Sequence, residues 1–461
     1  MTAAVAMLIF EASAQGKSSF NSSRRQDFYH QLRMGERVVL DVLARAGIEV
    51  DFCSASTAKE YKVVLVGIPA VSSVLAFYRA VAGYESWGRA RSFRVIAGGP
   101  GVTNLTAVRQ FIDLAVYGRA EGVIADLVAA AVDGKAEPGP HILDPSNPHA
   151  VSFAQVRTPY PHPIRHKGGE KTEGPIGCTR SCRYCQYRWT RRPSGHGDRY
   201  NVTIAGTNSV ETTADENGNL DPATGLVTIA IDGSSERIRA AVRKPITADL
   251  WLDSFDQYTA KREAMGKSCL VTVYNVLGYP GETDADRAEF GATWTRAKRR
   301  SVRIAVEVRS FGFRAMPCTP MQWEAVDVDH DWHELLSGRR FVDEPGVFIV
   351  VGGYGTSSPR LLLNDMAILR AAPTAESDRL IRVIATSGKL RSLKGRAAMR
   401  ALTQQFDLSP FIRRYSLDEP LPTFWLSGPT KLATLRKEAS KLRLALQADA
   451  VAGPAHRDGN A

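Results

Sequence analysis

Short apolar runs alternate with helical stretches through the first 130 residues, and this alternation limits the fold more than any other feature. The runs cover residues 6–12, 48–54, 63–68, 93–99 and 112–118. Runs of this length and composition are typical of buried parallel strands. Between the first two, Leu32, Val39, Leu43 and Ala46 recur at helical spacing, and Gly47 follows as a stop signal. The pattern predicts an α/β fold with an open, doubly wound parallel sheet of Rossmann-like or flavodoxin-like type.

The same alternation returns in the second half of the chain. Strand-like GLVTIAID, LVTVYNVLG and VRIAVEVRSF alternate with helical SSERIRAAVR and DADRAEFGATWTRAKR. A chain of 461 residues is long enough for two or three domains. We therefore predict a Rossmann-like domain, a linker rich in Pro, Gly and His, a second α/β unit, a smaller α/β or mostly helical region and a disordered tail. Their expected bounds are 1–135, 136–172, 173–330, 331–447 and 448–461.

Composition places the chain among globular proteins without a membrane segment. Hydrophobic residues make up 44% and charged residues 23%, and no apolar run approaches the roughly 18–20 residues of a membrane helix. No basic residue precedes the short apolar stretch at the N-terminus, which argues against a signal peptide. Cys53, Cys269 and Cys318 are scattered, which argues against a secreted disulfide framework. We expect a cytoplasmic protein, and its net charge of +11 leaves nucleic acid open as a partner.

Three further cysteines lie within eight residues of one another. The stretch GCTRSCRYCQYRW contains Cys178, Cys182 and Cys185 in a C-x3-C-x2-C pattern. A four-iron cluster is normally held by four thiolates, so three leave one iron open to a substrate or cofactor. Structural zinc needs a closed tetrahedral set, for which only His196 lies close downstream. The pattern favours an iron–sulfur cluster, and zinc remains the alternative.

This cysteine spacing, with aromatic Tyr184 before the last thiol, resembles the radical S-adenosylmethionine (SAM) enzymes. The stretch is similar to the version found in members with an N-terminal cobalamin domain. Residues 227–247, 276–283 and 314–324 resemble later segments of that family in the expected order. The resemblance implies a partial (βα) barrel over 173–330 and a 4Fe–4S cluster on the three cysteines. It also implies SAM-binding roles for a small set of residues: Tyr184, Ser234, Ser235, Glu236 and Gly281.

Local structure offers another explanation for some of these residues. A serine followed closely by a glutamate, as at 234–236, is a common helix N-terminal signal. The PGET sequence at 280–283 is equally typical of a turn before a helix.

The N-terminal sheet resembles a cobalamin-binding domain at several positions: Ser73, Leu75, Gly98, Gly99 and the VYGRAEG turn at 116–122. A hydroxyl group and glycines at strand ends allow a nucleotide tail to approach the backbone. The Asp-x-His-x-x-Gly motif that supplies a histidine to cobalt is absent, so the resemblance implies a cobalt whose lower face lacks histidine. An ordinary nucleotide-binding or scaffolding sheet is the alternative.

Together these cofactors imply a methyltransferase that carries a methyl group from SAM via methylcobalamin to a weakly nucleophilic carbon. The substrate would be a small molecule, a peptide or a nucleotide, and the electron donor a protein of flavodoxin or ferredoxin type. Other radical SAM outcomes remain open, namely cyclisation, rearrangement or modification of a nucleic acid or nucleotide. A zinc-stabilised nucleic-acid-binding protein is a further alternative, with RWTRRP and the basic C-terminal helix as phosphate contacts.

One feature departs from the family pattern. Only about forty residues separate Cys185 from the strand that begins near Leu226, and much of that span is polar, so the early strands of the barrel are expected to be shortened or rearranged. No catalytic acid or base can be assigned. Tyr274, Glu307 and Arg309 lie on strands expected to face the barrel interior in part, but a structural role explains each equally well.

Overall fold

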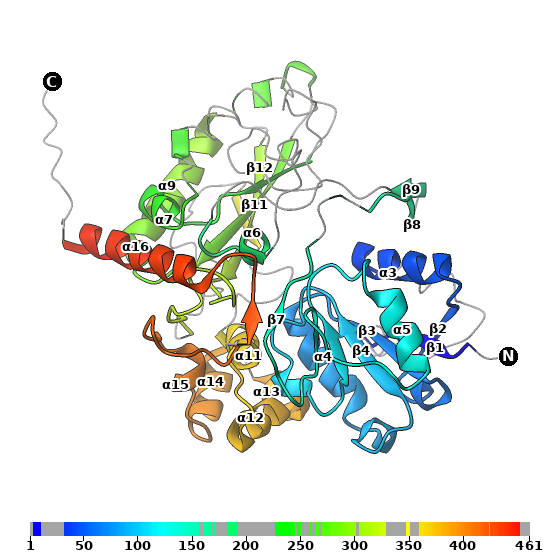
Figure 1. Cartoon of the computed structure of the whole chain (residues 1–461). Helices are drawn as coiled ribbons and strands as arrows, with labels where there is room; N and C mark the ends of the chain where they lie inside the picture. The colour runs from blue at the N-terminus through cyan, green and yellow to red at the C-terminus, as the bar shows by residue number, and fades with distance from the viewer. Residues whose placement is uncertain are drawn as a thin grey trace, which may run out of the picture.

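The computed structural model contains two separate parallel sheets, and Figure 1 shows them on opposite sides of the molecule. The structure describes residues 3–10, 32–155, 158, 160–166, 169–171, 182–190, 226–244, 247–249, 252, 256, 259–260, 263–266, 269–300, 304–328, 347–350, 359–393, 395–423 and 425–451.

The first sheet has the order β2-β1-β3-β4-β5-β6. Its strands are β1 (Val5–Leu8), β2 (Val50–Cys53), β3 (Val63–Gly67), β4 (Arg94–Gly98), β5 (Leu114–Val116) and β6 (Ile142–Leu143). The first five are parallel, and β6 joins β5 in the antiparallel direction. The five expected strands of this half are confirmed, and so is the α/β class.

Helices cover both faces of this sheet. Helix α4 (Val71–Val81) packs with Ala6 and Leu8 on one face. Helices α3 (Met34–Arg45) and α5 (Ile124–Val132) enclose a second cluster that includes Val5 and Met7. Successive residues of β1 thus enter two different cores, because side chains alternate across a strand. This explains why the strands read as continuous apolar runs.

The second sheet has the order β10-β11-β12-β13, and all its strands are parallel. They are β10 (Leu226–Ala230), β11 (Cys269–Leu277), β12 (Ile304–Gly312) and β13 (Val347–Val350). Helix α7 (Glu236–Ala241) follows β10, and helix α9 (Asp284–Arg300) follows β11. The carboxyl ends of the strands therefore share one edge, where open α/β sheets bind their ligands. The short helix α6 (Gln186–Thr190) precedes this sheet in the chain.

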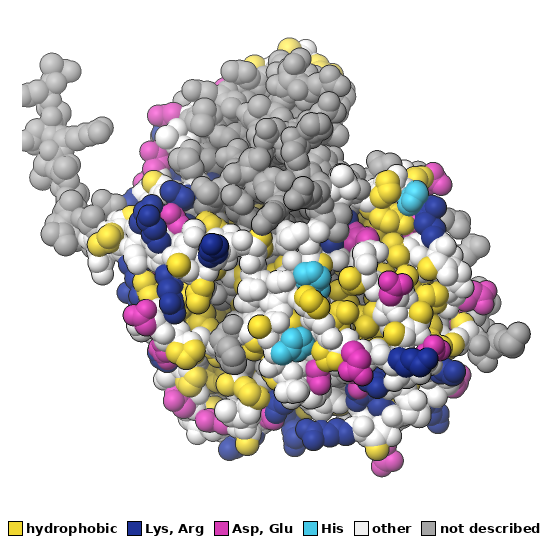
Figure 2. Space-filling model, in the orientation of Figure 1, with side chains coloured by type: hydrophobic (Ala, Val, Ile, Leu, Met, Phe, Trp, Pro, Cys, Tyr) yellow, Lys and Arg dark blue, Asp and Glu magenta, His cyan; other side chains and the backbone are white. Residues whose placement is uncertain are grey.

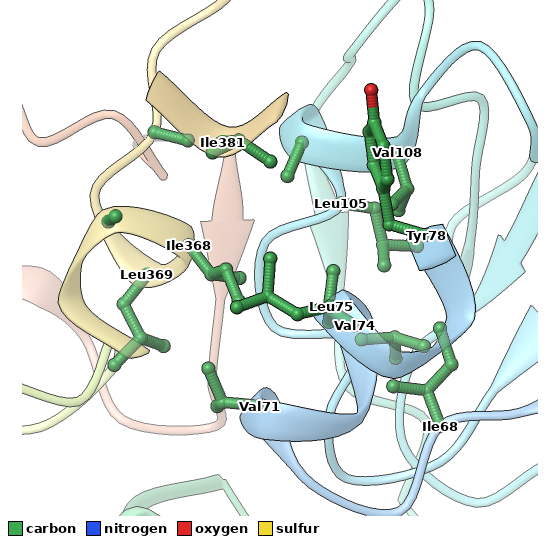
Figure 3. Close-up of a cluster of buried hydrophobic side chains, with 14 of the residues drawn as sticks. Ile68, Val71, Val74, Leu75, Tyr78, Leu105, Val108, Ile368, Leu369 and Ile381 are labelled. Carbon is green, nitrogen blue, oxygen red and sulfur yellow. The ribbon is translucent and has the colours of Figure 1, made fainter. Parts of the chain in front are cut away.

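Helices from the C-terminal third join the first sheet. Helices α11 (Pro359–Leu369) and α12 (Ala375–Thr386) contact α4. Figure 3 shows Ile368 on α11 and Ile381 on α12 directed toward α4 and its neighbouring loops, in a cluster of buried apolar side chains. The Asn104 side chain donates hydrogen bonds to the carbonyl oxygens of Leu369 and Ala371, at 3.2 and 3.0 Å. Because burial of apolar surface and satisfied polar groups both favour this contact, α11 and α12 form one unit with the N-terminal sheet.

The remaining described elements lie outside the two parallel sheets and the helices named above. They are β7 (Val151–Ser152), β8 (Ile164–His166), β9 (Gly169–Lys171), α13 (Gly388–Ser392), α14 (Gly395–Thr403), α15 (Ser409–Ile412), β14 (Leu426–Ser427), α16 (Leu432–Val451) and 3-10 turns at Ala58–Glu60, Glu85–Trp87 and Thr106–Val108. Strand β7, within the segment expected as a linker, pairs in parallel with β14 near the C-terminus.

The surface of the molecule carries a basic stripe. Figure 2 shows lysine and arginine side chains gathered along the α16 side, where Lys431, Lys437 and Lys441 are exposed. Within the described part of the chain, no helix is long and apolar enough to cross a membrane.

Candidate functional site

The cysteine loop leads directly into α6. Cys182 is buried and Cys185 half-buried, and the Cys185 amide donates to the Cys182 carbonyl oxygen at 3.4 Å. Neither thiol is in a disulfide. Cys178 lies outside the described residues, and the described residues alone contain no group of three or more potential metal ligands. Two of the three predicted ligands therefore lie on one tight turn, with their spacing fixed by the backbone.

Tyr184 joins this loop to the end of β10. Its hydroxyl donates to Asp232 Oδ2 at 2.6 Å, and its ring meets the ring of Tyr279 edge-on at 5.8 Å between centroids. Burial first, and then the Asp232 carboxylate, raise the pKa of Tyr184 well above its usual value. The phenol is thus a neutral hydrogen-bond donor at neutral pH, and the tyrosine holds the loop against the sheet.

Asp232 is the common partner at this strand end, although no sequence pattern pointed to it. Its carboxylate also pairs with Lys244, whose side chain is fully buried. Its carbonyl oxygen accepts from the Tyr279 hydroxyl at 3.4 Å. Asp232 adopts a left-handed conformation with φ 45°, which is uncommon for residues with a Cβ but which aspartate adopts more readily than most. This backbone conformation at a strand end is the one local feature that singles the residue out.

The three predicted residues at 234–236 have different surroundings. Ser235 caps α7, because its Oγ accepts from the Ile238 amide at 3.2 Å. Glu236 accepts from the Ala248 amide at 2.7 Å. Ser234 is fully buried, and its hydroxyl lies beside the Glu282 carboxyl without a hydrogen bond of ordinary geometry. Ser234 thus contributes a buried hydroxyl at this strand end, next to Glu282.

An acidic network supports the start of α7. Ser235 Oγ donates to Asp286 Oδ1 at 2.5 Å, and Arg237 Nη2 donates to Asp286 Oδ2 at 2.6 Å. Burial raises the pKa of Asp286, but hydrogen bonds from Arg237, Ser235 and Thr283 outweigh it and lower the pKa to about 2. Asp286 is therefore a permanently charged support rather than a proton donor.

The turn after β11 carries predicted Gly281 and a glutamate that the sequence did not single out. Gly281 has φ 76° and is exposed, as this turn requires. Glu282 Oε2 accepts from the Gly278 and Tyr279 amides, at 2.6 and 3.0 Å. Glu282 Oε1 is buried and has no partner of ordinary hydrogen-bond geometry among the described residues.

Burial also affects the protonation of this glutamate. It raises the pKa of Glu282 to about 7, although the nearby Ser234 hydroxyl and two backbone amides lower it in part. The carboxyl can therefore hold or release a proton near neutral pH.

Two more polar groups complete the same edge. Asn275 on β11 and Ser310 on β12 are register partners, and both are fully buried. Asn275 Oδ1 accepts from the Gly233 amide at 2.7 Å, whereas Asn275 Nδ2 and Ser310 Oγ have no partner among the described residues. The sequence analysis did not select either residue, because a single asparagine or serine inside an apolar strand belongs to no recognisable motif.

The opposite side of the same two strands carries Tyr274 and Arg309. They are also register partners, and Arg309 Nη1 donates to the Tyr274 hydroxyl at 3.3 Å. The Tyr274 ring stacks on that of Phe311 at 5.9 Å between centroids. The side chain of Glu307 lies outside the described part of the structure. These contacts are those of a packed pair, so neither residue is given a chemical role.

At the edge of the first sheet, the predicted serine and leucine belong to α4. Ser73 lies in its first turn and is 5% exposed. Leu75 is also buried, and Figure 3 shows its side chain directed at Ile368 of α11. Leu75 is therefore part of the apolar core between α4 and the C-terminal helices.

The two glycines at the end of β4, Gly98 and Gly99, differ from each other. Gly99 has φ 106°, and a Cβ there would lie 2.7 Å from the Ile68 carbonyl oxygen, so the backbone itself requires glycine. A Cβ on Gly98 would meet no described atom within 4 Å. Gly98 therefore has open space beside it, whereas Gly99 and Leu75 have roles in the fold. Residues 11–31, which follow β1 in the chain, lie outside the described residues.

Comparison with known proteins gives distant structural similarity alone. No family model matches the sequence, and no curated protein matches it. Among solved structures, the chain is similar to the cobalamin-dependent S-adenosylmethionine radical enzyme OxsB with aqua-cobalamin bound, at 12% identity and a TM-score of 0.30, covering 84% of this chain and 55% of that one. The apo, selenomethionine-labelled form of OxsB gives 12% identity and a TM-score of 0.29 with the same coverage.

The form of OxsB with aqua-cobalamin and S-adenosylmethionine bound gives 10% identity and a TM-score of 0.22, covering 96% of this chain and 66% of that one. In the first two matches the chain spans about half of the length of OxsB. Similarity at these TM-scores does not establish a shared fold, so the function has to be argued from the residues.

Proposed function

We propose that this chain is a radical SAM enzyme of the cobalamin-dependent, methyltransferase-type class. The observation that carries the proposal is the contact between the cysteine loop and the edge of the second sheet, made by Tyr184 and Asp232. Beyond that contact lie buried polar atoms: Asn275 Nδ2 and Ser310 Oγ have no partner among the described residues, and the Ser234 hydroxyl lies beside the Glu282 carboxyl. A buried polar group without a partner costs about 1–3 kcal/mol, so a polar ligand at this edge would stabilise the protein.

The chemistry of these groups suits the two proposed cofactors. Cys178, Cys182 and Cys185 would hold a 4Fe–4S cluster, as three thiolates on one loop can. A hydroxyl, an amide and a carboxyl, from Ser234, Asn275 and Glu282, match the amino, carboxylate and ribose groups of SAM. When bound, the cluster supplies an electron and SAM supplies either a methyl group or a radical.

The chain's own contribution is to bind, orient and exclude water. Tyr184, Tyr279 and Phe313 form a continuous aromatic wall, in which Tyr279 and Phe313 lie 5.3 Å apart between centroids. Tyr279 and Phe313 are both buried. An apolar wall keeps water from a reactive intermediate and strengthens the polar contacts beside it.

Cobalamin is the proposed second cofactor, held at the carboxyl edge of the first sheet. The open space beside Gly98, where an added Cβ would meet no described atom within 4 Å, supports this position for the nucleotide tail. Leu75 and Gly99 fit a role in the fold better than a role in binding, so no step is assigned to them. A methyl-carrying cobalt would make this protein a methyltransferase acting on a weakly nucleophilic carbon, supplied with electrons by a flavodoxin or ferredoxin.

The test is anaerobic reconstitution of the full chain with iron, sulfide and hydroxocobalamin. We expect brown protein with about four irons per chain, retained cobalamin after desalting, and SAM binding by calorimetry. Colourless protein that holds zinc would contradict the cluster. Iron without retained cobalamin would remove methyl transfer and leave another radical SAM outcome.

A matched pair of variants tests the proposed SAM edge. Ser234→Ala should weaken SAM binding about tenfold, which corresponds to the loss of one good hydrogen bond, with iron content unchanged. Ser440→Ala on α16 removes a hydroxyl that bonds only within its own helix and should leave SAM affinity at the wild-type value. Equal affinities for the two variants would exclude Ser234 from the binding site.

A further inference from the structure

The two residues between Cys182 and Cys185 are both anchored, in different directions. Arg183 is buried, and its amide donates to the Val242 carbonyl oxygen at 2.9 Å. The guanidinium pairs with Glu438 of α16 at 3.1 Å. One half of the short turn is thus tied to the end of α7 and to the C-terminal helix.

Tyr184 anchors the other half. Its hydroxyl bonds to Asp232, and Asp232 in turn pairs with Lys244. The Lys244 side chain has no exposed surface, and its amide donates to the Arg239 carbonyl oxygen at 2.7 Å. The tyrosine is therefore held by an ion pair inside the protein and not by a surface contact.

Both anchors converge on one tripeptide, Val242–Lys244, directly after α7. Val242 binds the backbone of Arg183, and Arg243 pairs with the same Glu438 at 3.3 Å. Lys244 reaches the partner of Tyr184. Arg243 has φ 59°, a left-handed conformation that ends the helix and turns Lys244 into the interior. The tripeptide therefore contacts Arg183 directly and Tyr184 through Asp232.

Stability alone does not account for this arrangement. A buried ion pair loses much of its attraction to desolvation, and apolar residues of similar volume are often as stable. Here the pair also requires a left-handed aspartate at a strand end. What the ion pair adds is direction, because the fixed carboxylate allows only one position of the Tyr184 hydroxyl.

We propose that Lys244 and Asp232 are positioning residues whose ion pair orients Tyr184 and so fixes the turn between Cys182 and Cys185. The ion pair sets the exposure of the two thiols in the metal-free chain. In the loaded protein it sets the electrostatic surroundings of the metal centre; this second consequence rests on the proposed function.

The first test uses the metal-free full chain and needs no cofactor. Alkylation by iodoacetamide, followed by peptide mapping, measures the modification rate of each cysteine. Tyr184→Phe and Asp232→Asn should label Cys182 and Cys185 severalfold faster than wild type. Cys53, which has no exposed surface and lies in the first sheet, serves as the internal reference for global unfolding.

A matched variant separates loop release from general destabilisation. Asp113 pairs with the buried Arg91 at 2.6 Å and accepts from the Val95 amide in the first sheet. Asp113→Asn should leave labelling of the cysteine turn at the wild-type rate. The proposal is overturned if Tyr184→Phe and Asp232→Asn give wild-type rates, or if Cys53 accelerates in parallel with the turn.

The second test uses reconstituted protein and measures the midpoint potential of the metal centre. Lys244→Met removes a positive charge and should shift the potential downward, whereas Asp232→Asn removes a negative charge and should shift it upward. A loss of packing alone would not give opposite signs, so shifts of one sign would contradict the proposal. If wild-type protein binds no iron, the proposed function fails, while the alkylation rates still decide the positioning role.

Discussion

The carboxyl edges of the two parallel sheets differ in what surrounds their polar atoms. At the first sheet, Asn104 is hydrogen-bonded to the end of α11, Leu75 is packed into the core, and Gly99 touches the neighbouring backbone. At the second sheet, Asn275 and Ser310 keep buried polar atoms without described partners. The two sheets share a parallel α/β design, so this architecture does not by itself make a binding site.

The difference has a physical origin in what packs against each sheet. Helices α11 and α12 contact α4 at the first sheet. Their side chains bury the apolar residues of α4, and carbonyl oxygens at the end of α11 accept the hydrogen bonds of Asn104. At the second sheet the cysteine loop approaches instead, and it contributes an aromatic ring and thiols. The edge of a sheet becomes a candidate site where the chain places reactive side chains and leaves buried polar atoms without hydrogen bonds.

The largest effect is expected at the cysteine loop. Cys185→Ala should abolish iron binding in reconstituted protein, because two thiolates cannot retain the cluster that three hold. Iron per chain and visible absorbance measure the result. Cys53→Ala, in the buried core of the first sheet, should keep full iron content. Full iron in Cys185→Ala would move the proposed metal centre elsewhere.

The next largest effect tests whether Leu75 at the first sheet packs in the core or contacts a cofactor. Leu75→Ala should lower the free energy of unfolding by about 2–4 kcal/mol in protein without cofactors, because it leaves a cavity between α4 and α11. Chemical denaturation measures it. Leu444→Ala, at a side chain of α16 that is 66% exposed, should change stability little. If the variant kept its stability but retained less cobalamin, Leu75 would be a cofactor contact and not a core residue.

A pH-dependent effect is expected from Glu282 at the second sheet. Its pKa is about 7 in the folded chain against an ordinary 4.5, so the folded state binds the proton more tightly. The contribution of Glu282 to the free energy of unfolding is fully present below about pH 4.5 and falls as the pH rises toward 7. Above pH 7 it no longer changes. The total is at most about 3 kcal/mol. Denaturation across this pH range should show the fall in wild type and lose it in Glu282→Gln.

The smallest effect is expected at Asn104. Asn104→Ala removes two hydrogen bonds to the end of α11 and should cost about 1–2 kcal/mol of stability, with SAM affinity unchanged. Asn147→Ala, at an exposed loop position, is the control and should have almost no effect. A change in SAM affinity in Asn104→Ala would show that the two edges are coupled, contrary to the comparison above.

The sequence predicted much of the fold but less of the candidate site. Apolar runs placed β1 to β5 and β10 to β12 within a few residues, because burial on both faces of a sheet imposes a visible composition. Cysteine spacing drew attention to the loop at 182–185. Lys244 escaped notice, because a single lysine near the end of a helix is usually solvated, and only the fold shows it buried beside Asp232.

The sequence by itself determined the α/β class, the positions of most strands and the cluster of three cysteines, because these depend on local composition and spacing. Tertiary structure decided which strand end the cysteine loop contacts and which polar atoms remain without partners. It also decided that Leu75 belongs to a core shared with α11 and not to an open edge. The physical reason is that hydrogen-bond satisfaction and burial depend on segments far apart in the chain, such as Tyr184 and Asp232, or Asn104 and Leu369.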